Sequence, residues 1–270
     1  MFGDFFIVGY ALMALNIPII FPLRIFSPDP QISAKSVLII DVKTGRTLFE
    51  KKSKDILPLA SLAKLLSSLV VLDTLQMDKE ITLSQDIIDT QGESGGFTVG
   101  EKVEARHLLF SALIHSSNDA MTSLAFDLGK ENFFTLVKNK IFQLGLKNTT
   151  ITDPAGLDPA TLGSATDVAT FAHVAFSNDF LRKILAIPEY NFTSRSGIFH
   201  KVVTTNPLIY DPRVIVAKTG TLDNVGQNYA ALIKPSRAAN ELMLVILGSN
   251  NREKDALAIL SWLEKAYVWH

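Results

Sequence analysis

Ser61 and Lys64 stand three residues apart, at a spacing that could support catalysis. Apolar residues recur with helical spacing from Leu62 onward, so the two side chains are expected to share one helix face, one turn apart. The N–H groups of a helix N-terminus favour an oxyanion, and an uncharged lysine amine can take a proton from a nearby hydroxyl. The pair alone is weak, because Ser-x-x-Lys arises about once by chance in a chain of this length.

Two later motifs strengthen this interpretation. Ser116-Ser117-Asn118 falls between two predicted helices, where its side chains could project into a cleft, although Asn118 could equally be a helix cap. Lys218-Thr219-Gly220-Thr221 follows an apolar strand, and its glycine would let a substrate approach the backbone. An ordinary strand end is the alternative there. The order and setting of the three motifs together indicate serine acyl-transfer chemistry.

Each motif also has a chance match elsewhere in the chain, and Ser249-Asn250-Asn251, which repeats Ser-x-Asn, lies after Lys218. Lys43-Thr44-Gly45 repeats the late triplet, but it is typical of a hairpin turn and precedes Ser61. Gly92-Glu93-Ser94-Gly95-Gly96 matches the Gly-x-Ser-x-Gly motif of α/β-hydrolases, which requires a strand before it and a helix after it. The flanking residues predict neither element, so a Ser-His-Asp hydrolase built on Ser94 is not favoured.

Composition excludes several classes of site. The 270 residues suit one large domain or two small ones, and the formal net charge of −1 gives no footprint for nucleic acid. The chain has no cysteine, and its histidines show no metal-ligand spacing, so we expect neither a metal nor a cofactor. His115 precedes Ser116 and is expected to be a structural histidine.

The N-terminal segment points to a membrane. Residues 5–23 contain no charged side chain, and as a helix they would span about 28 Å, close to the thickness of a bilayer core. Neither a basic n-region nor a small-x-small cleavage site is evident, so an uncleaved anchor is favoured over a signal peptide, and a buried apolar helix is the third possibility. We expect residues 1–30 to form this anchor or signal segment plus a linker, and residues 31–270 to form the peptidase domain.

Strand patterns at both ends of this domain enclose a helical middle. Strands are predicted at residues 36–41, 46–51, 214–217, 228–233 and 242–247, and a β-ribbon at 190–205. Helices are predicted at residues 61–75, 102–115, 119–128, 131–144, 167–176, 180–185 and 256–267. This order predicts an α+β fold, in which an antiparallel sheet is flanked by helices and a helical lobe is inserted at about residues 76–200, after the N-terminal hydrophobic helix.

Taken together, the motifs resemble those of the serine D-alanyl-D-alanine carboxypeptidases, the low-molecular-mass penicillin-binding proteins. The likeness extends from about Ser36 to the last helix and includes Gly156-Leu157-Asp158. Val216-Ala217 stands where the family often has Gly-Leu, and Ser117 replaces a usual glycine. The resemblance implies a β-lactamase/transpeptidase-like fold without a cofactor. It also implies a peptidoglycan stem peptide ending in D-Ala-D-Ala as substrate, β-lactam antibiotics as inhibitors, and a catalytic domain on the extracytoplasmic side of the cell membrane.

The resemblance also implies three catalytic roles. Ser61 would be the nucleophile that attacks the carbonyl between the two D-alanines and forms an acyl-enzyme. Lys64 would be its base, and Ser116 would relay the proton to the leaving amine.

Substrate-binding roles follow in the same way. Asn118 would bind the peptide and help to orient Lys64, whereas Lys218 and Thr219 would hold the terminal carboxylate. The N–H groups of Ser61 and Thr221 would form the oxyanion hole. Arg252 could assist in binding the carboxylate, although a position on the solvated surface is favoured for it.

Two rival functions remain for this site. A serine β-lactamase would need a deacylating glutamate between Asn118 and Lys218, where only Glu131 and Glu189 occur, and neither has a Glu-x-x-Leu-Asn context. A catalytically inactive, membrane-tethered peptidoglycan-binding module would have no need to retain all of the reacting groups. The preference for carboxypeptidase over endopeptidase activity stays open at this point.

Overall fold

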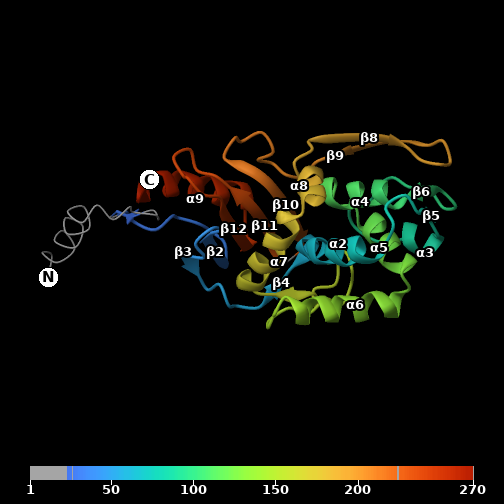
Figure 1. The fold of residues 1–270 in the computed structure, drawn as a ribbon, viewed down its shortest axis with the longest axis horizontal. Helices are drawn as coiled ribbons and strands as arrows, with labels where there is room; N and C mark the ends of the chain where they lie inside the picture. The colour runs from blue at the N-terminus through green and yellow to red at the C-terminus, as the bar shows by residue number, and fades with distance from the viewer. Residues whose placement is uncertain (1–22, 26, 224, 270) are drawn as a thin grey trace, which may run out of the picture.

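The computed structural model describes residues 23–25, 27–223 and 225–269. Its centre is an antiparallel five-stranded sheet in the order β10-β11-β12-β2-β3 (Figure 1). The strands are β2 (Ser36–Asp41), β3 (Thr47–Lys51), β10 (Val214–Leu222), β11 (Gly226–Ile233) and β12 (Leu242–Ser249). The predicted sheet of distant segments is therefore confirmed, and β10, which carries the Lys-Thr-Gly motif, is an edge strand.

Helices cover both faces of this sheet, which explains why its strands are apolar on both sides. Val37 and Ile39 belong to the core under α9 (Arg252–Ala266), whereas Leu38 between them belongs to the core of the helical lobe. In β12, Leu244 likewise belongs to the core under α9, and Val245 belongs to the core of the helical lobe. This alternation follows from the two-residue period of a strand between two apolar layers.

Most of the helices lie between β3 and β10 in the chain, and they form a helical lobe beside the sheet. Helix α2 (Ala63–Thr74) is its axis, and residues 63–71 are all buried. Around it lie α3 (Gln85–Ile88), α4 (Ala105–Ile114), α5 (Asn118–Asp127), α6 (Lys130–Gln143), α7 (Ala165–Ser177) and α8 (Asp179–Leu185). Helix α2 packs against α4, α5, α6 and α7, and α7 also packs on the sheet. Because α2 is enclosed, it holds its first turn rigidly beside the sheet (Figure 1).

Short strand pairs complete the lobe. They are β4 (Leu57–Pro58) with β7 (Leu162–Gly163), β5 (Glu80–Thr82) with β6 (Lys102–Glu104), and β8 (Glu189–Thr193) with β9 (Phe199–Val203). The last pair confirms the predicted ribbon. Pro58 ends β4, and the 3₁₀ helix η1 (Ala60–Leu62) comes before α2, where the sequence predicted a single helix over residues 61–75.

The start of the described chain lies beside its end. Strand β1 (Leu23–Arg24) pairs with β13 (Tyr267–Val268), and the Trp262 indole N–H donates to the carbonyl of Pro28 at 2.9 Å. The predicted membrane segment lies outside the described residues except for Leu23, which is in β1. Among the described residues, no helix is both long and apolar enough to cross a bilayer.

Candidate active site

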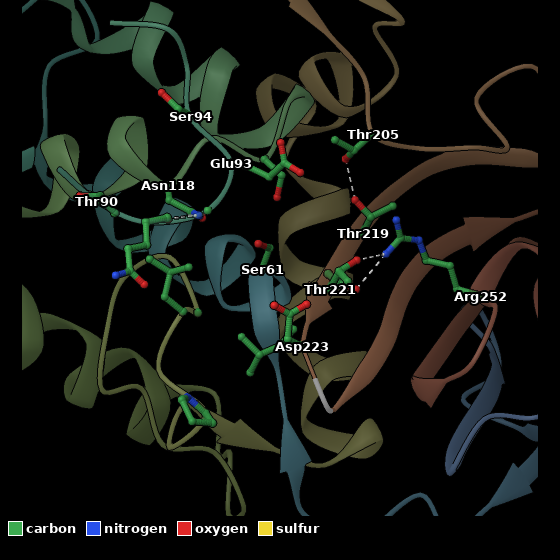
Figure 2. A pocket seen from close by; sticks show the side chains of 18 residues that line it. Ser61, Thr90, Glu93, Ser94, Asn118, Thr205, Thr219, Thr221, Asp223 and Arg252 are labelled. Carbon is green, nitrogen blue, oxygen red and sulfur yellow. Dashed lines mark hydrogen bonds between the residues drawn. The ribbon is translucent and has the colours of Figure 1, made fainter. Parts of the chain in front are cut away.

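Ser61 lines a cleft of about 870 Å³ between the helical lobe and the edge of the sheet. Figure 2 shows its side chain in the middle of the cleft, with Thr219, Thr221 and Arg252 toward one side and Asn118 toward the other. The residue is in η1 rather than in a regular α-helix, and Ala60 before it has a positive φ of 48°. The tight turn brings the serine out of the core while α2 stays buried.

Two glycines and one asparagine fix this turn. A Cβ built on Gly156 would lie 1.9 Å from the Ala60 carbonyl oxygen, and one on Gly220 would lie 3.2 Å from the Ser61 nitrogen. Glycine at these positions therefore lets two backbone segments approach the nucleophile closely. On β11, the buried Asn228 side-chain amide donates to the Leu59 carbonyl at 3.0 Å and ties the turn to the sheet.

The Lys64 amine sits at the centre of three oxygen atoms. Its Nζ lies 2.8 Å from Ser61 Oγ, 2.7 Å from Asn118 Oδ1 and 2.9 Å from the Ala155 carbonyl oxygen. The Asn118 and Ala155 oxygens can only accept hydrogen bonds, whereas the serine hydroxyl can donate or accept. A neutral amine satisfies all three positions, because it donates to the two carbonyls and turns its lone pair toward Ser61.

The surroundings of Lys64 favour this neutral form. The side chain is completely buried, and burial lowers its pKa from 10.5 to about 7, although the charges of Asp153, Glu93 and Asp119 act in the opposite direction. Desolvation disfavours the ammonium because water solvates it far better than the protein interior does. A large fraction of Lys64 can therefore act as a base near neutral pH.

The Ser-x-Asn motif turns at the start of α5, with Ser116 at a positive φ of 66°. Ser117 caps the helix by accepting a hydrogen bond from the Ala120 N–H at 3.1 Å. Asn118 therefore does not cap the helix, and its side chain links the loop at Gln91 to Lys64. Its amide donates to the Gln91 carbonyl at 2.8 Å, and its oxygen accepts a hydrogen bond from Lys64. The expectation that this motif projects into a cleft is confirmed.

Lys218 extends from β10 to the Ser-x-Asn motif. Its Nζ donates to Ser116 Oγ at 2.7 Å and to the Thr219 carbonyl at 3.0 Å. Burial lowers the pKa of Lys218 well below 10.5, and the charges of Lys64 and Arg252 lower it further. The Thr219 hydroxyl lies 2.6 Å from the Thr205 hydroxyl, so it too is held in place.

A serine, a buried lysine at one helical turn, a second serine and a second lysine thus meet around one cleft. A sequence profile described as D-alanyl-D-alanine carboxypeptidase matches residues 25–251 of the chain. The chain belongs to this family. It is a serine DD-peptidase, and the family acts on peptidoglycan peptides that end in D-Ala-D-Ala and binds β-lactams.

Named relatives include both carboxypeptidases and endopeptidases. The chain is 33% identical over 200 residues to the D-alanyl-D-alanine carboxypeptidase DacB2 of Mycobacterium tuberculosis, covering 72% of this chain and 68% of the relative. It is 28% identical over 248 residues to a D-alanyl-D-alanine endopeptidase of Pseudomonas aeruginosa, covering 88% and 79%. It is also similar to a D-alanyl-D-alanine carboxypeptidase structure from M. tuberculosis, with a TM-score of 0.80, 25% identity, and 87% and 92% of the two chains covered. The Streptomyces K15 DD-transpeptidase shares the fold, with a TM-score of 0.81, 23% identity, and 87% and 98% covered.

Arg252 corrects one expectation about this DD-peptidase. It is not on the solvated surface: it lines the cleft, and its guanidinium donates to the Gly220 carbonyl at 2.9 Å and to the Thr221 hydroxyl at 2.7 Å. The sequence could not predict this position, because Arg252 is the first residue of α9 and reaches β10 only through the packing of α9 on the sheet.

Ser94 has a structural role in the described fold. No helix or strand flanks it, and its hydroxyl donates to Asp119 Oδ2 at 2.9 Å. The buried Asp119 carboxylate also accepts the Gly95 N–H at 2.9 Å and the hydroxyl of Ser117. The departure from glycine at position 117 therefore adds a hydroxyl that joins this network. This network holds the loop that contains Gln91 against the turn formed by the Ser-x-Asn motif.

The remaining side chains of interest separate into structural and cleft-lining ones. As expected, His115 is structural, since its Nδ1 bonds the Val203 carbonyl at 3.0 Å. Glu93 and Asp223 line the cleft, and the sequence analysis missed both as site residues. They occupy loops without a local pattern, so only the assembled fold reveals their position.

Proposed function

We propose that the protein is a carboxypeptidase that removes the terminal D-alanine of stem peptides through an acyl-enzyme on Ser61. The observation that carries this proposal is the position of the buried Lys64 amine, whose Nζ lies 2.8 Å from Ser61 Oγ. Lys64 takes the hydroxyl proton as Ser61 Oγ attacks the carbonyl carbon between the two D-alanines. The N–H groups of Ser61 and Thr221 stabilise the oxyanion, and removal of one such donor typically costs about 3–4 kcal/mol.

Departure of D-alanine requires a proton on its amine. Ser116 Oγ gives its proton to the amine in this proposal, and the proton that Lys64 took from Ser61 replaces it, so Lys64 and Ser116 both return to their starting states. Lys218 holds the Ser116 hydroxyl in place through the 2.7 Å contact and keeps its own proton. The acyl group then remains on Ser61 as an ester, which water hydrolyses once the amino acid has left. Asn118 holds the acyl-side peptide through its side-chain amide and keeps Lys64 oriented.

Recognition of a free C-terminus is the second part of the proposal. Thr219 and Arg252 line one end of the cleft, and the buried Lys218 amine lies directly behind them against Ser116 Oγ, so a carboxylate there would meet a hydroxyl and cationic groups together. Because peptides with a terminal D-alanine present this carboxylate, the arrangement supports exopeptidase cleavage.

Endopeptidase activity is the second candidate, and the P. aeruginosa relative named as an endopeptidase favours it. A β-lactamase is not favoured, because Glu131 and Glu189 are exposed and neither lines the cleft. An inactive binding module is likewise disfavoured by the preserved contact between Ser61 and Lys64.

One incubation separates these candidates. The protein is given a stem pentapeptide and, separately, a cross-linked peptide dimer, and the products are weighed by mass spectrometry. Loss of one alanine from the pentapeptide is expected, and release of monomers from the dimer would add endopeptidase activity. Binding of both peptides without any cleavage would contradict the proposal.

We further propose that residues 5–23 anchor the protein in the cell membrane with the catalytic domain on the extracytoplasmic side. The support is the absence of charge over a length that matches a bilayer. The full chain should stay with membranes after a high-salt wash, which removes electrostatic attachment. A chain starting at Leu23, which keeps β1, should be released in active form. A mature N-terminus between residues 25 and 35 in cells would instead indicate a cleaved signal peptide.

A further inference from the structure

The free edge of β10 defines the direction in which a peptide would bind in the cleft. Strand β10 is the last strand of the sheet on this side, and its residues 219–222 line the cleft. An extended peptide can bind to such an edge as an additional strand. Under the proposed function, the terminal carboxylate lies at Lys218 and Thr219, so the preceding residues of the peptide run toward the far end of β10.

Asp223 stands at that far end. It follows β10 directly, lines the cleft and is exposed. Among the residues that the structure describes, it has no hydrogen-bond or ion-pair partner. In Figure 2, Thr221 lies between Asp223 and Arg252, so the cleft carries a cation on one side of Thr221 and a carboxylate on the other.

We propose that Asp223 binds the ammonium group on the side chain of the residue that precedes the two D-alanines, so that the enzyme prefers stem peptides with a diamino acid there. The proposal rests on the proposed function and names a subsite for it. Thr219 and Thr221 are two residues apart in β10, which directs their side chains to one side of the strand, and Asp223, in the turn that follows, also lines the cleft.

The distances fit such a substrate. Thr219 and Leu222, the last residue of β10, are about 10 Å apart along the strand, and Asp223 follows Leu222 in the turn. If the terminal D-alanine lies beside Thr219, the third residue from the end lies about 7 Å further along an extended peptide. A lysine-length side chain adds about 6 Å, which brings its ammonium to Asp223.

Charge also fixes the orientation. Lys218 and Arg252 would repel an ammonium at the carboxylate end, so a peptide with a terminal carboxylate and an internal ammonium fits the cleft in one direction only. Glu93, the other carboxylate of the cleft, lies 3.7 Å from His115 Nε2 and away from the line of β10.

The test compares two tripeptides that differ only in this charge: Nα-acetyl-L-Lys-D-Ala-D-Ala and its Nα,Nε-diacetyl form. The ratio of their kcat/KM values for D-alanine release is measured for the wild type. A ratio of about 2 to 5 in favour of the free amine is expected, as for exposed ion pairs, and it should shrink in 0.5 M salt.

Two variants assign the effect to Asp223. Asp223→Asn should bring the ratio to about one, and Asp223→Lys should invert it, whereas Glu93→Gln should keep the wild-type ratio. Equal rates for both peptides in the wild type, or an unchanged ratio in Asp223→Asn, would overturn the subsite while leaving the proposed function intact. Release of D-alanine from neither peptide, together with no penicillin adduct, would overturn the proposed function and the subsite with it.

Discussion

The pKa of Lys64 predicts how acylation of Ser61 depends on pH. Burial lowers this pKa from 10.5 to about 7. One pKa unit corresponds to about 1.36 kcal/mol, so the protein favours the neutral amine over the ammonium by about 5 kcal/mol relative to a lysine in water. The neutral fraction of Lys64 should be about one-tenth at pH 6, one-half at pH 7 and nine-tenths at pH 8.

The acylation rate should follow this fraction, because only the neutral amine can take the hydroxyl proton. Between pH 6 and pH 8 the second-order rate constant is expected to rise about tenfold and then level off. A lysine with the ordinary pKa would give a rise of about a hundredfold over the same range, without a plateau below about pH 10.

The assay is stopped-flow acylation by a fluorescent penicillin from pH 5.5 to 9. Glu93→Gln should move the midpoint to lower pH, because the charge of Glu93 raises the pKa of Lys64. Lys64→Arg should show no acylation at any pH, since guanidinium keeps its proton throughout this range. A rate that keeps rising through pH 9, or wild-type acylation in Lys64→Arg, would refute Lys64 as the base.

Two further substitutions, Gly156→Ala and Arg252→Gln, test the turn at Ser61 and the recognition of the terminal carboxylate. Gly156→Ala should lower the acylation rate about a hundredfold, because the new Cβ would lie 1.9 Å from the Ala60 oxygen and displace the turn. Gly197→Ala is the matched control, with the same φ of +81° and no atom within 4 Å of the new Cβ; it should cost about 1 kcal/mol in urea unfolding and keep normal acylation. Arg252→Gln should raise KM about tenfold for peptides with a free terminal carboxylate, but not for the same peptides with a C-terminal amide. An unchanged KM for the free acids would show that Arg252 does not contact the substrate.

Much of the fold could be predicted from sequence, because its elements have strong local patterns. The buried strands β2 and β12 are largely apolar runs, α5 begins at the Ser117 cap, and α5 and α6 end just before Gly129 and Gly145. The order of the three short motifs was enough to predict that Ser61, Lys64 and Ser116 share one cleft. The distances between their side chains and those of their partners agree with the predicted roles. Those roles remain predictions until acylation is measured.

The positions that the sequence did not predict depend on contacts between distant segments. Ser61 lies in a 3₁₀ turn because Gly156 and Gly220 bring backbone against it from loops that are far away in the chain. The cleft position of Arg252 arises where α9 packs on the sheet. Asp223 has no partner among the described residues, and its position in the cleft depends on the edge of β10. No periodicity or local motif carries such information.

The central claim is that Ser61 forms the acyl-enzyme, and labelled penicillin tests it most directly. Opening of the β-lactam ring would leave an ester on Ser61 while the leaving group stays tethered and obstructs the hydrolytic water. Peptide mapping of the labelled protein should locate a covalent adduct on Ser61 that persists for minutes or longer. Ser61→Ala should lose both the adduct and D-alanine release, whereas Ser94→Ala should keep both. An adduct in Ser61→Ala, or rapid repeated turnover of penicillin by the wild type, would contradict the account.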